Sequence, residues 1–193
     1  MNNNDIIAFF DRWAPDWDAD MIRDDAKIGF ILDAAHVAPG ARVLDVACGT
    51  GVLFGDYLAR SAAHVTAVDI APEMARIAKE KAEGTCITVL CGDAQELDLP
   101  GGYDCCVIYN AFPHFTHPEA LIARIASLLS PGGTLCIAHG MSLAALHQHH
   151  ERARNVSRDM FTAEELGAML SAYFDVETSV SDDEKFVVAG KKR

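Results

Sequence analysis

The sequence predicts an α/β protein built on a doubly wound sheet. From residue 41 onward, short runs rich in β-branched residues alternate with segments of helical periodicity, which is typical of βαβ units and a parallel sheet. Glycine and proline clusters separate these segments. The last two apolar runs are joined by only a few residues, which predicts an antiparallel hairpin. We therefore expect a Rossmann-like sheet of seven strands, mostly parallel with a C-terminal antiparallel hairpin strand, and helices on both faces.

Each element has its own sequence signal. The expected strands are ARVLDVA, HVTAVDI, CITVLC, YDCCVIYN, GTLCIAH, YFDVETSV and KFVVAG. The expected helices of the α/β core are VLFGDYLARSA, PEMARIAKEKA and PEALIARIASLL. Turns are predicted at Gly84, at residues 100–102 and at residues 131–133. Thr162 and Glu165 have the spacing of a capping box, which predicts a helix that runs to about Ala172.

The remaining segments suggest how a binding site is covered. Two helical patterns, IIAFFDRWAPDW and KIGFILDAAHV, precede the first strand. With 193 residues the chain is expected to form one domain. Its expected parts are an N-terminal helical lid (1–40), a ligand-binding core (41–138), a lid and acceptor segment (139–160), and a C-terminal helix with hairpin (161–193). The aromatic residues of the first part are expected to serve packing, the alternative being an aromatic lid over a positively charged ligand. They are Phe9, Phe10, Trp13 and Trp17.

Composition excludes several classes of partner. The formal net charge of −12 opposes binding to a phosphate backbone, and the basic residues form no stripe, so no nucleic acid is expected as a partner. No run approaches the roughly 18 consecutive apolar residues that a membrane span needs, and no secretory signal is visible. A cytoplasmic monomer or homodimer is expected. The six cysteines show no C-x-x-C spacing, which suits reduced, buried thiols rather than a zinc site or disulfides.

Three acids follow or end expected strands, where a doubly wound sheet binds its ligands. They are Asp45, Asp69 and Asp93. Taken singly, each acid is equally explained as a cap of a helix or turn. A dinucleotide site is disfavoured, because Asp45 would lie close to a pyrophosphate of the same charge. The glycine spacing also departs from G-x-G-x-x-G, since Gly55 is the next glycine after Gly51.

A phosphate-free ligand with a positive centre, an amino group and a ribose suits this acid distribution better, and S-adenosyl-L-methionine (SAM) has these features. The series VLDVACGTG, VTAVDI, CGDAQELDLP and YDCCVIYNAFPHF, over residues 41 to about 138, resembles the motif series of class I SAM-dependent methyltransferases. The resemblance implies SAM as cofactor and S-adenosylhomocysteine (SAH) as product. The resemblance is specific because it rests on a series of motifs in the right order.

The resemblance also implies residue roles. Asp45 would receive the amino group of the cofactor, and Asp69 would accept both ribose hydroxyls. Asp93 would accept from the adenine amino group, and Asn110 would lie near the methyl group. The cofactor-binding residues implied are Asp45, Ala47, Gly49, Gly51, Asp69, Ile70, Gly92, Asp93, Ala94 and Asn110.

The acceptor side is less defined. Asn110 is followed by Ala-Phe-Pro-His-Phe, which departs from the Asn-Pro-Pro-Tyr/Phe pattern of enzymes that methylate DNA bases. His114 and His139 follow strands at the carboxyl edge, so each is a candidate catalytic base or a residue that only orients substrate. With Asn110 they form the expected catalytic set.

A histidine-rich stretch follows in the lid and acceptor segment. His147, His149 and His150 are expected to form a solvated helix face rather than a metal site, with His150 the most inward. No metal is expected in the protein. The expected function is methyl transfer from SAM to a small molecule by in-line displacement. The alternatives are a non-catalytic SAM-binding sensor or partner subunit and, third, a Rossmann oxidoreductase.

Overall fold

The computed structural model describes residues 2–19, 22–150 and 156–193, except the side chains of His149 and His150. Seven strands form one sheet in the order β3-β2-β1-β4-β5-β7-β6. The strands are β1 Arg42–Val46, β2 His64–Asp69, β3 Ile87–Cys91, β4 Tyr103–Tyr109, β5 Leu129–His139, β6 Phe174–Ser181 and β7 Phe186–Lys192. The first five strands pair in parallel, and β7 is antiparallel to both β5 and β6. The predicted mixed sheet with a C-terminal hairpin is confirmed.

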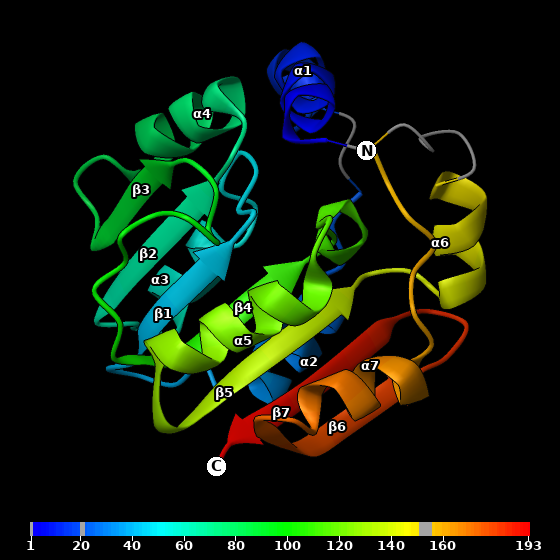
Figure 1. Ribbon diagram of the computed structural model, residues 1–193. Coiled ribbons are helices and arrows are strands. Elements are labelled where there is room, and N and C mark those ends of the chain that lie inside the picture. Colours follow the sequence, from blue (N-terminus) through cyan, green and yellow to red (C-terminus); the bar gives the residue numbers. More distant parts are fainter. Residues whose placement is uncertain (1, 20–21, 151–155) are drawn as a thin grey trace.

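The strand order reverses between β1 and β4, which lie side by side at the centre of the sheet. A crevice opens at the carboxyl ends of strands at such a point, because the connections on either side of it run to opposite faces. Figure 1 shows α1 above this end of the sheet and α6 beside it. The topology therefore places a ligand site between β1, β4 and these two helices.

Helices cover both faces of the sheet, as predicted. They are α1 Asn3–Trp13, α2 Asp25–Ala34, α3 Phe54–Ala59, α4 Pro72–Ala82, α5 Pro118–Leu128, α6 Leu143–His150 and α7 Ala163–Leu170, with short 3₁₀ helices η1 Ala14–Asp16 and η2 Phe112–His114. One core cluster joins the sheet to α2, α3 and α4, and the other joins the opposite face to α5 and α7 (Figure 1). Alternate residues of β4 serve the two clusters, because successive strand side chains point to opposite faces.

Local signals account for the helix starts. The capping box predicted at Thr162 and Glu165 is present, and each side chain satisfies a backbone N–H of the other residue. Asn2 and Asp24 cap α1 and α2 by accepting from the N–H groups three residues on. A proline opens α4 and another opens α5, where no N–H partner is needed. Helix α3 is shorter than the predicted segment.

One predicted turn proved wrong. Residues 131–133 lie inside β5, which starts at Leu129 directly after α5. The strand departs from regular pairing there, because Tyr103 pairs with Leu129 while Cys105 already pairs with Thr134. Gly132 has a φ of 76° within this irregular stretch. The proline and glycines therefore mark a bulge within a strand rather than a boundary between elements.

The cysteine prediction needs a partial correction. All six thiols are free, and four are buried as predicted: Cys48, Cys105, Cys106 and Cys136. Cys91 is exposed, because it lies on the outermost strand β3 of the sheet. No helix in the described part of the chain is both long and apolar enough to span a membrane.

Candidate active site

A cavity of about 570 Å³ lies at the carboxyl edge of the sheet. Its size falls within the range of small-molecule sites. It is lined by the ends of β1, β2 and β4, by the segments that follow β3 and η2, and by residues of α1, α6 and the segment before α7. Eleven of the twelve residues predicted for the site line this one cavity: Asp45, Ala47, Gly49, Asp69, Ile70, Gly92, Asp93, Ala94, Asn110, His114 and His139.

Asp45 is a buried carboxylate within β1, and its residue is 2% exposed. Its neighbours across the sheet are Ala67 and Val107, so it caps no helix. Among the described residues, its Oδ2 atom has no hydrogen-bond partner. Burial raises the pKa of Asp45 to about 7. The nearby Tyr57 hydroxyl opposes this rise, although it makes no hydrogen bond of good geometry within the described part of the chain.

A buried acid without a partner is costly, so such groups concentrate where a ligand supplies the missing interaction. The Asp69 carboxylate lies near enough to add to the rise in the Asp45 pKa. The floor of the cavity is thus negatively polarised, which favours a cationic group there.

Asp69 ends β2, and both of its carboxylate oxygens are already bound by the backbone. Oδ2 accepts from the Gly49 N–H at 2.8 Å, and Oδ1 accepts from the Ala71 N–H at 2.9 Å. Burial raises the pKa of Asp69 to about 6, and these two hydrogen bonds oppose the rise. The alternative that Asp69 caps the next helix is wrong, because α4 begins after Ala71. A carboxylate has about four acceptor sites, so capacity for two hydroxyl donors remains.

Of the three acids, Asp93 is the least well supported as a ligand-binding residue. Its Oδ1 accepts from the Gln95 N–H at 2.9 Å, which is a turn contact of the kind that the capping alternative foresaw. Its Oδ2 accepts from the Asn3 side-chain amide of α1 at 2.9 Å. Asp93 therefore ties the N-terminal helix to the segment after β3 while it lines the cavity.

Strained backbone marks the ends of both central strands. Ala47, just after β1, has a φ of 59°, and Asn110, just after β4, has a φ of 54°. Such angles cost free energy in residues other than glycine and cluster at ligand sites. Gly49 has a φ of 58°, which the glycine accepts without cost. The backbone therefore turns away sharply at both strands and leaves the space that the cavity occupies.

Gly51 is the predicted residue that does not line the cavity in the described structure. A Cβ atom at this position would lie 2.6 Å from the Phe54 ring, and the φ of Gly51 is 86°. The glycine is required because the first residue of α3 packs against it. Gly51 therefore allows the loop between β1 and α3 to pack closely against Phe54, and it does not face the cavity.

His114 is held between two segments that border the cavity. Its Nδ1 atom lies 2.8 Å from the Val156 carbonyl oxygen and 3.1 Å from the Ser157 hydroxyl. A carbonyl oxygen only accepts, so in the neutral ring the proton resides on Nδ1 and the lone pair on Nε2. The Phe10 ring of α1 makes an edge contact with the imidazole at 5.0 Å. This tautomer is the one in which Nε2 can take a proton.

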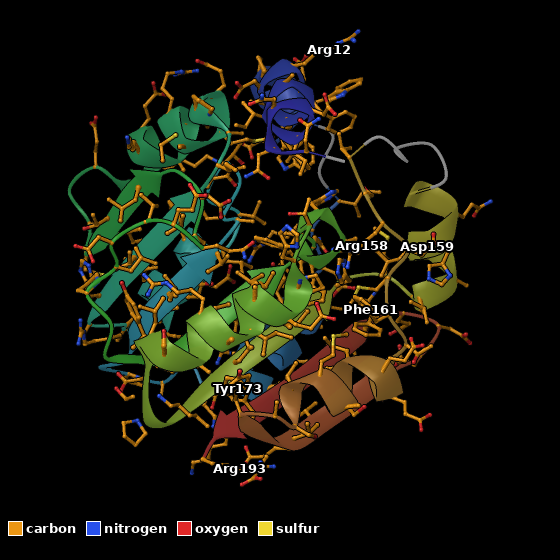
Figure 2. The ribbon with its side chains drawn as sticks, viewed as in Figure 1. Arg12, Arg158, Asp159, Phe161, Tyr173 and Arg193 are labelled. Carbon is orange, nitrogen blue, oxygen red and sulfur yellow. The ribbon has the colours of Figure 1, made fainter. Side chains whose placement is uncertain are left out.

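The segment that binds His114 is itself fixed to η2. The Arg158 N–H donates to the Pro113 carbonyl at 3.0 Å, and its guanidinium donates to the Thr116 carbonyl at 3.1 Å. The same guanidinium lies 5.8 Å from the centre of the Phe161 ring, and Figure 2 shows both residues on the segment that leads to α7. The position of the His114 ring is thus set by residues far away in sequence.

His139 and Asn110 line the cavity from neighbouring strands. His139 is the last residue of β5, is 1% exposed, and lies 6.3 Å from the Phe186 ring. The Asn110 Oδ1 accepts from the Gly140 N–H at 2.9 Å. This contact orients the Asn110 amide and ties the end of β4 to the residue after β5. The three polar residues of the predicted catalytic set therefore share one cavity.

The N-terminal segment divides into two parts with different roles. Phe9, Phe10, Trp13 and Trp17 pack against one another, as expected, and they also line the cavity. Trp13 is 47% exposed, whereas Phe10 and Trp17 also pack against α4. Helix α2 is a core helix rather than a lid, because it buries Ile28, Ile31 and Leu32 against the sheet.

Sequence reasoning missed several residues of the site. Tyr109 precedes Asn110 and lines the cavity, and burial raises the pKa of its hydroxyl. Its position at the end of the YDCCVIYN run was a usable signal. Arg23 and Ser157 also line the cavity but had no such signal, because tertiary packing alone brings them close to the strands.

The histidine-rich helix differs from expectation where it is described. His147 is half-buried, and its Nε2 lies 3.1 Å from the Met160 carbonyl oxygen, so this residue does not belong to a solvated face. The side chains of His149 and His150 lie outside the described residues, and so does the prediction that His150 turns inward. Within the described residues, no group of three or more His, Cys, Asp or Glu side chains is arranged to hold a metal ion.

Comparison with known proteins agrees with this geometry. A family model described as a methyltransferase domain matches residues 43–133. Ubiquinone biosynthesis O-methyltransferase of Xanthomonas campestris pv. campestris (strain B100) is 37% identical over 144 residues, which are 69% of this chain and 58% of that protein. The chain thus spans 58% of the length of the curated relatives that it matches.

Two solved structures share the fold. The putative methyltransferase in complex with the Haloferax volcanii Trm112 methyltransferase activator aligns over 97% of both chains, with a TM-score of 0.81 and 21% identity. Magnesium protoporphyrin IX methyltransferase of Synechocystis PCC 6803, solved with bound SAH, aligns over 100% of both chains, with a TM-score of 0.75 and 18% identity. With the motif series, the sheet order and the methyltransferase-domain match, the chain belongs to the class I methyltransferases, the family whose cofactor is SAM.

Proposed function

We propose that this protein is an enzyme that transfers a methyl group from SAM to a small-molecule acceptor and releases SAH. The observation that carries the proposal is the Asp45 carboxylate, which is buried, lines the cavity and has an oxygen without a partner among the described residues. Bound SAM supplies a methyl group already activated by a sulfonium. The positive charge and amino group of this cofactor suit the unpaired acid, so the residues present fit it.

The remaining cofactor contacts are proposed from the same cavity. Asp69 keeps the loop after β1 in place through the Gly49 N–H and accepts the ribose hydroxyls with its remaining capacity. Ala47 and Gly49 bring their backbone close to the cofactor. The nucleoside base is proposed to lie against residues that follow β2 and β3: Ile70, Gly92, Asp93 and Ala94.

The chain's contribution to the reaction is alignment, exclusion of water and, where the acceptor needs it, removal of a proton. Asn110 is proposed to lie near the reacting methyl group, because it ends β4 beside the Asp45 strand. His114 and His139 are the candidate bases, since both line the cavity. The Val156 carbonyl favours the His114 tautomer whose Nε2 can accept a proton.

We further propose that the whole chain acts as one methyltransferase domain. In it, the core 41–138 binds the cofactor, while α1 and the described residues 139–150 and 156–160 cover the acceptor side. The contacts of Asn3 with Asp93 and of Phe10 with His114 support this arrangement, because they join α1 to both halves of the cavity.

The similarity to ubiquinone biosynthesis O-methyltransferase supports an enzyme that acts on a small molecule. A non-catalytic SAM-binding sensor or partner subunit would need the same cofactor residues. It would have no need of polar side chains beside the reacting methyl group. Asn110, His114 and His139 supply such side chains, which favours the enzyme.

Calorimetry tests the cofactor assignment. The protein is expected to bind SAM and SAH but not NAD. Replacing Asp69 with Ala is expected to weaken SAM binding by on the order of 1.5–3 kcal/mol, because two ribose donors lose a charged acceptor. The exposed Asp98, replaced with Asn, serves as the control and is expected to bind like the wild type. Binding of NAD, or equal SAM affinity in Asp69→Ala and wild type, would refute the assignment.

Labelled SAM then tests for catalysis. Incubation with a panel of thiols, phenols and amines is expected to give a labelled product from at least one class. A protein that binds SAM but methylates nothing in the panel would favour the sensor alternative.

A further inference from the structure

The charged residues that line the cavity indicate which acceptor charge the site favours. Four of its lining residues carry carboxylates: Asp16, Asp45, Asp69 and Asp93. Arg23 is the only arginine or lysine among the described residues that line it. A single arginine is a sufficient anchor for a carboxylate or phosphate group, provided that its charge is available. The charge preference of the site therefore depends on how Arg23 is bound.

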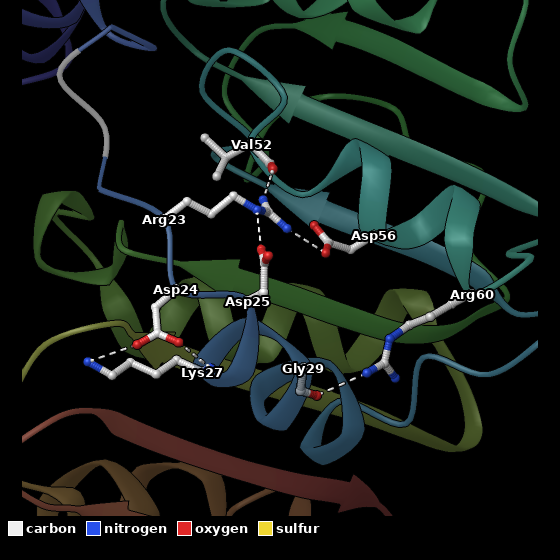
Figure 3. A network of polar contacts seen from close by, with 8 residues as sticks. All are labelled: Arg23, Asp24, Asp25, Lys27, Gly29, Val52, Asp56 and Arg60. Carbon is white, nitrogen blue, oxygen red and sulfur yellow. Dashed lines mark hydrogen bonds and ion pairs between the residues drawn. The ribbon is translucent and has the colours of Figure 1, made fainter.

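Each of the three Arg23 guanidinium nitrogens already donates to a neighbouring residue (Figure 3). Its Nε donates to Asp25 at 2.6 Å, one terminal nitrogen donates to Asp56 at 2.6 Å, and the other donates to the Val52 carbonyl at 3.0 Å. Two carboxylates thus compensate one guanidinium. The cavity is left with a negative field that disfavours an anionic ligand.

Another arginine, Arg12, lies close in sequence to the aromatic residues but does not change this balance. Its guanidinium lies 5.9 Å from the centre of the Trp13 ring and does not line the cavity. Figure 2 shows Arg12 extending from α1 away from the sheet. It therefore provides no anchor inside the site.

The N-terminal segment that includes α1 presents an aromatic surface to the cavity. The Phe9 and Phe10 rings are 5.3 Å apart, and Phe10 lies 5.7 Å from Trp17, both in edge-to-face contact. Trp13 lies 6.5 Å from Phe9 and is 47% exposed although it lines the cavity. A flat ring that reaches this surface gains both apolar burial and ring contacts.

We propose that the acceptor is an aromatic small molecule without a negatively charged substituent, and that the compensated Arg23 is a specificity-determining residue that disfavours anionic acceptors. This inference rests on the proposed function and refines it. The aromatic surface selects the ring. Because Arg23 is already paired, the described lining offers no available arginine or lysine to a carboxylate, sulfate or phosphate substituent.

Three probes separate the ring from the charge. Catechol is a neutral aromatic diol, 3,4-dihydroxybenzoate adds a carboxylate to the same ring, and cyclohexane-1,2-diol removes the aromaticity. Each is titrated into protein saturated with SAH and followed by calorimetry. Intrinsic fluorescence provides a second signal, because the chain has two tryptophans and both line the cavity.

Catechol is expected to bind and to change the tryptophan fluorescence. The other two probes are expected to bind at least about tenfold more weakly, because one brings a carboxylate to a cavity whose arginine is already paired and the other loses the ring contacts. Equal affinity for catechol and 3,4-dihydroxybenzoate, or no binding of catechol, would overturn the inference.

A variant tests the role of Arg23 directly. Asp56→Asn removes one compensating charge, so it is expected to improve the affinity for 3,4-dihydroxybenzoate relative to catechol by about fivefold. The matched control is Asp33→Asn, which breaks a comparable ion pair with Arg60 at 2.7 Å outside the cavity and should leave that ratio unchanged. Equal ratios in the two variants would remove Arg23 from the explanation.

The SAH titration distinguishes the two levels of failure. A protein that does not bind SAH would contradict the proposed function itself. A protein that binds SAH but fails the probe tests would contradict this inference alone.

Discussion

Replacing Asp45 with Asn should stabilise the ligand-free protein at neutral and alkaline pH. Burial raises the pKa of this carboxyl from 3.8 to about 7. Below about pH 4 it is protonated in both the folded and unfolded states, so its stabilising contribution is fully present there. Between about pH 4 and 7 it ionises only on unfolding, and the folded state loses stability as the pH rises. The complete loss is on the order of 4 kcal/mol.

An amide at position 45 does not ionise, so the variant avoids this loss. It still buries a polar group, which costs about 1–3 kcal/mol when unpaired, so the expected net gain above pH 7 is about 1–3 kcal/mol. Asp69 also has a raised pKa, of about 6, and acts in the same direction. The variant should therefore retain a weaker fall in stability between pH 4 and 6.

Urea unfolding of the ligand-free protein at pH 5 and pH 8 measures this effect. The free energy of unfolding of the wild type should fall between the two values, and that of Asp45→Asn should fall less. The exposed Asp98, replaced with Asn, is the control and should behave like the wild type. The same Asp45 variant should bind SAM more weakly, because the cofactor loses its ionic partner. An equally steep fall in Asp45→Asn, or lower stability at pH 8, would refute the reasoning about burial.

Three further predictions concern catalysis, partners and packing. If His114 or His139 is the base, its Gln variant should lose roughly 10²–10⁴-fold in kcat and should also lose the matching limb of the pH–rate profile. The SAM affinity of that variant should stay within a few-fold of the wild type. If both histidines only shape the pocket, KM should rise instead. Because the net charge is −12, gel shifts with DNA or RNA at low salt should show no complex, and a salt-sensitive shift would contradict this. Gly51→Ala should destabilise the fold by about 1–3 kcal/mol through its clash with Phe54, whereas Gly55→Ala, with open space around its Cβ, should not; equal melting temperatures would disprove it.

Asp45, whose Oδ2 has no hydrogen-bond partner among the described residues, is proposed to link stability to cofactor binding. Asp45 costs the ligand-free fold free energy, and the cofactor is proposed to recover it on binding. Mutations that improve stability at this position are therefore expected to reduce affinity for the cofactor. Buried polar groups at functional sites follow this trade-off in general.

The sequence by itself determined the sheet and most of the residues that we propose to bind the cofactor. Short runs rich in β-branched residues set the strands, and their alternation with helical segments set the parallel order. Parallel strands end at the same edge of the sheet. Asp45, Asp69 and Asn110 lie at or near strand ends, so they had to come together at that edge. These signals are local, so each can be read within a few residues.

Only the tertiary structure decided which residues line the proposed acceptor side of the cavity. Arg23, Trp13 and Ser157 come from segments before β1 and after α6, and they reach the cavity through packing that no local pattern encodes. The same cause explains the errors: residues 131–133 are drawn into a strand by their neighbours in the sheet, and His147 is turned inward by a carbonyl thirteen residues away. Local propensity sets the elements, whereas long-range contacts set which side chains face one another.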